Sequence, residues 1–207
     1  KLDLDRKTIV DVGANIGVYT IPLAKHYPNA KVFAIEASPT IFNELKANCE
    51  VNNLVNVILI NKAVSNKDNE VIAFYTSPTR SGASTMVGEW RRFITEEYGA
   101  KFGVEKVETL TIDTMIRTMG LDEISLLKLD IEGAENLALE GAKNALGHKK
   151  IKNMMIEYHT YQNYQYITSL LNKFGYIYQT KEKVSRGDPT AVGNFRGHII
   201  AYLPPTS

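Results

Sequence analysis

The chain has 207 residues, of which 44% are hydrophobic, and this size and composition suit one globular domain with a full core. The 24 Lys and Arg residues nearly balance the 23 Asp and Glu residues, and the net charge of +1 excludes a global attraction to nucleic acid or to an anionic membrane. The single cysteine, Cys49, excludes a disulfide within the chain and argues against a cysteine-based zinc site.

Neither a membrane span nor a secretory signal is expected. No apolar run approaches the ~18 residues that a spanning helix needs, and no signal peptide is visible. We therefore expect a cytoplasmic protein. The first residue is Lys1 rather than Met, which is compatible with natural sequence upstream.

The first third of the chain alternates short β-branched runs with longer helical patterns. These patterns predict strands at residues 8–12, 31–36 and 57–60 and helices at 16–27 and 39–52. Ser38 is a favourable N-cap, and Pro39 suits the first helical position. The third strand is apolar throughout, as expected of a parallel strand that is buried on both faces.

The middle of the chain, about residues 66–110, is less regular and is interpreted as an insertion. Its patterns predict a strand at 70–75, a Ser-, Thr- and Gly-rich loop at 77–90, a helix at 91–103 and a strand at 104–110. The stretch from Ser77 to Arg92 has two interpretations. It is either a substrate loop, in which Arg80, Trp90 and Arg91 offer contacts, or a solvated connection.

Regular alternation resumes beyond the insertion. The patterns predict helices at 111–119, 136–146 and 164–174 and strands at 124–130, 151–158, 176–180 and 196–203. Such alternation predicts an α/β domain with an open, mostly parallel sheet and helices on both faces. No long helix separates the last two strands, which predicts an antiparallel last strand. We expect the whole chain, residues 1–207, to form one domain.

The turn after the first strand carries the first chemical signal. Residues 11–17 have the sequence Asp-Val-Gly-Ala-Asn-Ile-Gly, and Glu36 ends the next strand. Ligands of open α/β sheets bind beyond the carboxyl ends of the strands, where glycines let the backbone approach closely and an acid accepts hydrogen bonds from a ribose. The pattern therefore predicts an adenosine-containing ligand.

The spacing within this turn distinguishes between ligands. The dinucleotide fingerprint has a glycine where the pyrophosphate passes, and Asn15 stands there in this chain. Asp11 adds a negative charge, which disfavours phosphates and suits a ligand with a cationic centre, such as S-adenosylmethionine. An NAD-dependent oxidoreductase is thereby disfavoured. The structural alternative is a glycine turn made only for packing.

Five segments together resemble the FkbM family of S-adenosylmethionine-dependent methyltransferases. They are residues 11–17, 36–39 (Glu-Ala-Ser-Pro), 62–65 (Lys-Ala-Val-Ser), 81–84 (Ser-Gly-Ala-Ser) and 129–135 (Leu-Asp-Ile-Glu-Gly-Ala-Glu). The resemblance extends over about residues 8–202. It implies a class I methyltransferase fold, a Rossmann-like sheet with a reversed last strand, and methyl transfer usually to a hydroxyl oxygen. Acceptors in the family include sugars and macrolide-type natural products.

The resemblance also implies a set of cofactor contacts. These are Asp11, Gly13, Ala14, Asn15 and Gly17 around the methionine part, Glu36 at the ribose, Ala37, Ser38 and Ala63 at the adenine, and Asp130 beside them. Many methyltransferases have an acid after the third strand that accepts from the adenine amino group. Asn61 and Lys62 stand in that region here, so the candidate acceptors are the side-chain carbonyl of Asn61 and the hydroxyl of Ser65.

Three carboxylates, Asp130, Glu132 and Glu135, follow the strand at 124–130. In one interpretation, Asp130 or Glu132 orients the acceptor hydroxyl or removes its proton. In the other, the acids offset a helix dipole at its N-terminus, which fits Glu135 best. We favour a catalytic role for Asp130, because it belongs to the strand end.

Glu157 and His159 stand at the end of the next strand. His159 is a candidate general base, because its unperturbed pKa is about 6.5. Glu157 is a candidate to orient it, to act as the base itself, or to bind a metal together with Asp130. The alternative is that His159 only caps the strand. No ligand spacing demands a metal, so none is expected.

These patterns together predict an S-adenosylmethionine-dependent enzyme. The resemblance to the FkbM family implies that it O-methylates a small-molecule, saccharide or lipid-like acceptor. The alternatives are an N-methyltransferase on the same fold and a non-catalytic domain that binds an adenosine ligand. DNA amino methyltransferases often carry Asn/Asp-Pro-Pro-aromatic after the fourth strand, where residues 130–133 here have Asp-Ile-Glu-Gly. No nucleic-acid partner is expected, and the sequence carries no signal for a particular oligomeric state.

Overall fold

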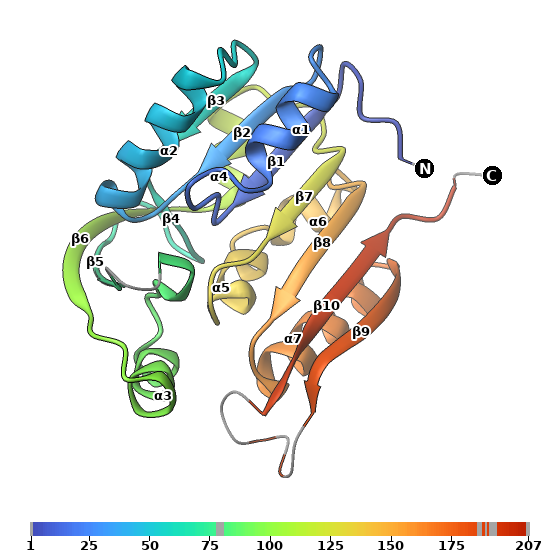
Figure 1. Cartoon of the computed structure of the whole chain (residues 1–207). Coiled ribbons are helices and arrows are strands. Elements are labelled where there is room, and N and C mark those ends of the chain that lie inside the picture. Colours follow the sequence, from blue (N-terminus) through green and yellow to red (C-terminus); the bar gives the residue numbers. More distant parts are fainter. Residues whose placement is uncertain (1, 78–80, 186–187, 189, 191–193, 206–207) are drawn as a thin grey trace.

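The computed structural model describes residues 2–77, 81–185, 188, 190 and 194–205. Its main sheet has seven strands in the order β3-β2-β1-β7-β8-β10-β9 (Figure 1). These strands are β1 (Thr8–Val12), β2 (Lys31–Ile35), β3 (Val57–Ile60), β7 (Leu126–Leu129), β8 (Asn153–Tyr158), β9 (Ile177–Ser185) and β10 (Phe195–Tyr202). All pairs among β3, β2, β1, β7 and β8 are parallel, and β10 runs antiparallel to β8 and β9. The predicted fold class and the antiparallel last strand are confirmed.

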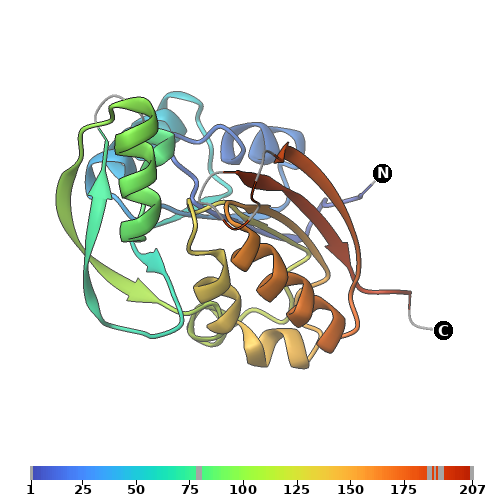
Figure 2. The same ribbon diagram turned by 90° about the horizontal axis from the view of Figure 1, so that it is seen from below.

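Helices cover both faces of this sheet. They are α1 (Thr20–His26), α2 (Pro39–Val51), α4 (Ile112–Thr118), α5 (Glu135–Glu140), α6 (Lys143–Gly147) and α7 (Tyr161–Lys173). Helix α3 (Gly88–Tyr98) and a short 3-10 turn at Ser81–Ala83 belong to the middle segment instead (Figure 1). In Figures 1 and 2, α1 and α2 lie on one face and α5, α6 and α7 on the other. The largest buried cluster joins the sheet to α4–α7. Among the described residues, none of the helices combines the length and hydropathy needed to span a bilayer.

The middle segment folds as a separate small sheet beside the ends of β2 and β3 (Figure 1). Its order is β4-β6-β5, with β4 (Ala63–Val64), β5 (Val71–Thr76) and β6 (Gly103–Leu110). The hydroxyls of Ser38 and Thr40 donate to the Glu105 carboxylate on β6 and so connect this sheet to α2. Backbone bonds between Tyr75 and Thr85 hold the following loop against β5.

Three predicted helices had wrong boundaries. Helix α1 begins at Thr20 rather than at residue 16, because Asn15 (φ 51°) and Gly17 (φ 99°) take left-handed conformations that a helix does not contain. Helix α3 covers 88–98 rather than 91–103, since Gly99 ends it in a left-handed conformation. Helix α7 begins three residues early, at Tyr161, where the Thr160 side chain accepts from the backbone N–H of Asn163.

The helix predicted at 136–146 is in fact two helices, α5 and α6. The chain breaks at Gly141, whose Cα lies so close to the Ser65 carbonyl that a Cβ would overlap the carbonyl oxygen. The predicted strand at 176–180 continues to Ser185 as β9, because it pairs with β10 along its whole length. The predicted loop at 77–90 holds the 3-10 turn and the start of α3, and residues 78–80 lie outside the described part.

Candidate functional site

A cavity of about 340 Å³ lies at the carboxyl ends of β1, β2 and β7. The strand order reverses between β1 and β7, which is where open α/β sheets bind their ligands. The cavity is lined by these predicted residues: Gly13, Ala14, Asn15, Glu36, Ala37, Ala63, Asp130 and Glu132. Tyr19 and Phe74, which the sequence did not single out, also line it.

The turn after β1 is shaped by its neighbours. Gly13 has φ +72°, and a Cβ there would overlap the Asp130 carbonyl oxygen. The backbone N–H of Asn15 donates to Glu36 Oε2 at 2.9 Å, which fastens the turn to the end of β2. Gly17 does not line the cavity. It faces Ile21 and Leu45, and its φ of +99° suits glycine.

Glu36 is buried at the end of β2. Its Oε1 accepts from the backbone N–H of Ser38 at 3.0 Å, and its Oε2 accepts from Asn15. Burial raises the pKa of Glu36, and the two N–H donors and the charge of Lys128 oppose the shift. Each oxygen has accepted one donor, so the carboxylate keeps further lone pairs for the hydroxyls of a ligand.

Three residues expected at the cofactor support the cavity from outside it. Asp11 is fully buried, and its Oδ2 accepts from the Thr20 hydroxyl at 2.6 Å. Ser38 caps α2 by accepting from the backbone N–H of Ile41. The Asn61 amide donates to the carbonyls of residues 36 and 37, at 2.8 and 3.0 Å, and so fixes the chain after β2.

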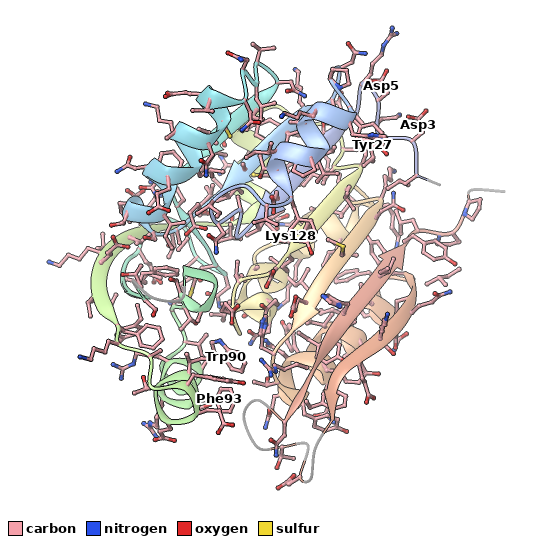
Figure 3. All side chains as sticks on the ribbon, in the orientation of Figure 1. Asp3, Asp5, Tyr27, Trp90, Phe93 and Lys128 are labelled. Carbon is pink, nitrogen blue, oxygen red and sulfur yellow. The ribbon has the colours of Figure 1, made fainter. Side chains whose placement is uncertain are left out.

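Lys128 is a site residue that the sequence analysis missed. It is buried on β7, where its Nζ donates to the Gly13 carbonyl at 2.8 Å and lies 3.2 Å from Asp11 Oδ1 and 3.7 Å from Asp130 Oδ2 (Figure 3). Burial disfavours its charge, but the two carboxylates outweigh burial and raise the pKa of Lys128. The sequence does carry a signal for it, which is a lone lysine inside an apolar strand. A buried lysine needs an oppositely charged or hydrogen-bonding partner.

Glu132 has a strained backbone and two supports from the insertion. Its φ of 51° is left-handed, which is uncommon for a glutamate. The Thr85 hydroxyl donates to the Glu132 carbonyl at 2.8 Å, and the Trp90 indole N–H donates to Glu132 Oε2 at 2.6 Å. Figure 3 shows Trp90 reaching from α3 toward the strand ends. The insertion thus sets the position of this carboxylate.

Of the contacts offered between Ser77 and Arg92, Trp90 reaches this site. The guanidinium of Arg91 lies 4.4 Å from the ring centroid of Tyr75 instead. Arg80 lies outside the described residues.

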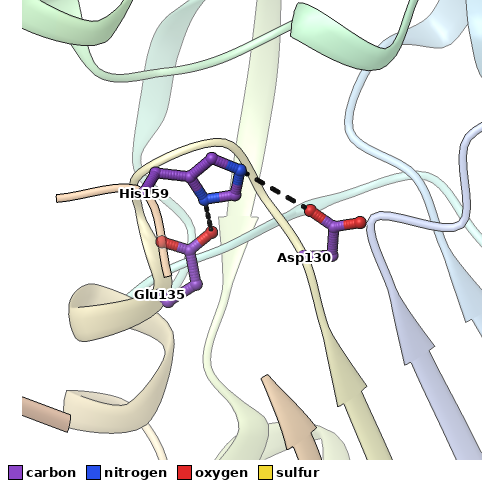
Figure 4. Close-up of side chains that lie close together, drawn as sticks. All are labelled: Asp130, Glu135 and His159. Carbon is purple, nitrogen blue, oxygen red and sulfur yellow. Dashed lines mark hydrogen bonds and ion pairs between the residues drawn. The ribbon is translucent and has the colours of Figure 1, made fainter. Parts of the chain in front are cut away.

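His159 is held by Glu135, which the sequence assigned to the helix dipole. Glu135 Oε1 accepts from His159 Nδ1 at 3.0 Å and from the backbone N–H groups of residues 131 and 133. Glu135 Oε2 accepts from the Asn163 amide at 2.6 Å. Glu157, expected to orient His159, lies 3.0 Å from His198 Nε2. The Nε2 of His159 consequently faces Glu132 Oε2 at 3.5 Å. It also faces Asp130 Oδ1 at 3.9 Å, as Figure 4 shows.

These groups shift one another's pKa values. Burial alone would lower the pKa of His159, but the carboxylates of Glu135, Glu132 and Asp130 outweigh it and raise the pKa to about 10. Burial raises the pKa of Glu132 to about 7, against the opposing effects of His159 and Trp90. Burial also raises the pKa of Asp130, which Lys128 and His159 partly offset. At neutral pH His159 is therefore an imidazolium, and Glu132 is close to its midpoint.

Asp130, Glu135 and His159 also have the spacing of a three-ligand cation site. One ligand atom from each lies within 4.8 Å of the others (Figure 4). Both oxygens of Glu135 already accept hydrogen bonds, and a cation there would replace the bond between Glu135 and His159. We therefore interpret the cluster as a hydrogen-bonded carboxylate–histidine arrangement.

A second cavity, of about 320 Å³, adjoins the first. Trp90, Glu132, Glu157, His159 and Arg196 are among its lining residues. It shares Gly82 and Glu132 with the first cavity, so the two spaces meet at the strained turn after β7.

Comparison with known proteins agrees with this arrangement. A family model described as a methyltransferase FkbM domain matches residues 11–178. Methyltransferase sdnD of Sordaria araneosa is 27% identical over 169 residues, which are 72% of this chain and 65% of that protein. The 31-O-demethyl-FK506 methyltransferase FkbM of Streptomyces tacrolimicus is 26% identical over 170 residues, which are 73% of this chain and 65% of that protein. The chain thus spans about two thirds or less of the length of these relatives.

Solved structures show the same fold. The precorrin-6y C5,15-methyltransferase of Geobacter metallireducens superposes with a TM-score of 0.56 at 13% identity, and the match covers 98% of this chain and 82% of that one.

Proposed function

Because the chain belongs to the FkbM methyltransferase family, we propose that it transfers a methyl group from S-adenosylmethionine to a hydroxyl oxygen of a small-molecule, saccharide or lipid-like acceptor. The observation that carries the proposal is the position of Glu132, which lines the cofactor cavity and lies 3.5 Å from His159 Nε2. Burial there raises the pKa of Glu132 to about 7. The name of the Streptomyces relative, 31-O-demethyl-FK506 methyltransferase, denotes O-methylation, which supports an oxygen acceptor.

The residues around the first cavity fit S-adenosylmethionine. Glu36 would hold the ribose hydroxyls, and the side chains of Ala37, Ala63 and Phe74 offer an apolar slot for the adenine. Asp130 also lines the cavity and would face the amino-acid part of the cofactor. In this assignment Asp11, Gly17 and Ser38 shape the cavity without lining it. Lys128 lines the cavity and also fixes the Gly13 carbonyl.

The cofactor supplies a methyl group that is already activated on a cationic sulfur. The protein must then align the acceptor oxygen, exclude water and remove one proton. An ionised Glu132 accepts that proton. The Trp90 N–H and the His159 imidazolium, 2.6 and 3.5 Å from Glu132 Oε2, stabilise its ionised form.

His159 is a poor candidate for the base itself. With a pKa of about 10 it carries a proton on each nitrogen at neutral pH. Glu135 fixes the ring through Nδ1, so that the Nε2–H faces Glu132 and Asp130. We assign His159 to positioning and charge stabilisation, and Glu132 to proton removal.

Glu132→Gln tests this assignment. The amide keeps the size of the side chain but cannot accept the proton, so kcat should fall by about 10²–10⁴-fold with an acceptor found by screening labelled methyl transfer. Affinity for S-adenosylmethionine should change little. Glu140→Gln is the matched control, because Glu140, the last residue of α5, pairs with Lys143 of α6 and lines neither cavity. Unchanged turnover in Glu132→Gln would refute the assignment.

A further inference from the structure

We propose that the second cavity binds an acceptor that carries a carboxylate as well as the reacting hydroxyl, and that Arg196 recognises this carboxylate. The inference rests on the proposed function, because it names the acceptor class of the same site.

The two cavities are arranged as donor and acceptor sites should be. They meet at Gly82 and Glu132, and they share no other lining residue among those described. A molecule in the second cavity therefore reaches the proposed base while the cofactor occupies the first. The volume of about 320 Å³ suits a compact acceptor or the reacting end of a longer one.

Arg196 contributes an unused donor to the second cavity. It lies at an irregularity of β10, where the register with β9 shifts between Arg196 and Gly197. Its guanidinium carbon lies 5.8 Å from the ring centroid of Trp90. Its Nε is buried and has no hydrogen-bond partner among the described residues. Within the same part of the chain, Arg196 forms no ion pair. Arg196 as a whole is half-buried, but its Nε–H is buried, and an unpaired buried donor is costly. A ligand is therefore the natural source of a partner.

The chemistry of the cavity selects a carboxylate. A guanidinium presents a planar fork that matches a planar carboxylate through two parallel hydrogen bonds. Glu132 and Glu157 line the same space, and their negative charge disfavours a dianionic phosphate more than a single carboxylate. Hydroxyl groups of the same molecule suit the two glutamates as hydrogen-bond acceptors. The expected acceptor is thus a hydroxylated carboxylic acid.

The Arg196 Nε–H resonance tests the binding directly. The protein is labelled with ¹⁵N, loaded with S-adenosylhomocysteine, and titrated with D-glucuronate, D-gluconate and L-lactate, with D-glucose and inorganic phosphate as comparators. The Arg196 signal, assigned by its loss in Arg196→Gln, should shift saturably with at least one carboxylate and not with glucose. The Arg91 Nε–H is an internal control, because it is also buried without a described partner but lines neither cavity.

Three results would overturn the inference. They are no shift with any of the carboxylates, an equal shift with glucose, and a larger shift with phosphate.

Kinetics give an independent readout. With a carboxylate acceptor, Arg196→Gln should raise KM by about 10- to 100-fold and leave kcat within a few-fold, as expected for a lost charged hydrogen bond. Arg196→Lys should fall between the wild type and Arg196→Gln, because it keeps the charge without the fork. Affinity for S-adenosylhomocysteine, measured in parallel, should stay at the wild-type value and so report intact folding.

The two proposals fail in distinguishable ways. If the wild type binds no S-adenosylmethionine, the proposed function is wrong. If the wild type binds it and transfers methyl groups, but Arg196→Gln leaves KM unchanged, the acceptor inference is wrong.

Discussion

Glu132 and His159 form the chemical centre of the site, 3.5 Å apart at the ends of two neighbouring strands. The pKa of Glu132 rises to about 7 because it is buried, and that of His159 rises to about 10 because three carboxylates surround it. At a pH between about 7 and about 10, both groups are charged and stabilise each other. A carboxylate with a pKa near 7 is a stronger base than an ordinary glutamate and is suited to accept a proton near neutral pH.

Trp90→Phe tests the origin of the Glu132 pKa. Because the indole N–H stabilises the ionised carboxylate, its loss should raise the pKa of Glu132 further. The wild-type kcat/KM should increase as pH rises through about 7, and in Trp90→Phe that rise should move to higher pH. Phe93→Leu is the control, since Phe93 stacks on Trp90 but has no bond to Glu132. Identical pH profiles in wild type and Trp90→Phe would count against Glu132 as the base.

The residues of the site differ in how well the sequence predicts their positions. Gly13, Asn15, Glu36 and Asp130 follow buried strands, and parallel strands bring their carboxyl ends to one edge, so their meeting could be predicted. Glu135 could not be linked to His159, because that contact depends on how α5 packs against the end of β8. The charge partners of a buried group follow from packing rather than from spacing along the chain.

The break between α5 and α6 depends on residues that are distant from it in the sequence. The local pattern from 136 to 146 favours one helix, but the Ser65 carbonyl occupies the space that a side chain at Gly141 would need. The backbone N–H of Asp113 donates to the Gly141 carbonyl, and the Asp113 carboxylate accepts from the backbone N–H groups of residues 144 and 145. Tertiary contacts therefore override the local helix pattern. The alternation of strands and helices was predicted correctly, because burial of β-branched runs is a property of each segment itself.

Gly141→Ala should destabilise the protein by about 1–3 kcal/mol, as an overpacked site does, because the new methyl must displace the Ser65 backbone. Gly88→Ala should be neutral or stabilising by up to about 1 kcal/mol, because Gly88 lies in α3 and no described atom lies within 4 Å of the point that the new methyl would occupy. Denaturant unfolding of both variants provides the comparison. Equal stability of Gly141→Ala and wild type would show that the Ser65 carbonyl does not exclude a side chain at this position.

On the scale of the whole molecule, the sheet and the insertion each supply one side of the site. The reversal of strand order at β1 and β7 opens the cofactor cavity, and the segment after β5 closes it with Ser84 and Met86. The same segment supports Glu132 through Thr85 and Trp90. A substrate loop was one interpretation of this segment, and the structure shows its described part packed against the turn that carries Glu132.

Calorimetric titration with S-adenosylmethionine, S-adenosylhomocysteine and NAD tests the central claim most directly. We predict that the wild type binds the first two and not NAD. Glu36→Ala should weaken both affinities by about 10- to 100-fold through lost hydrogen bonds to a charged group. Glu44→Ala, an exposed position on α2, should bind as the wild type does. Tight binding of NAD, or equal affinities in wild type and Glu36→Ala, would contradict the account.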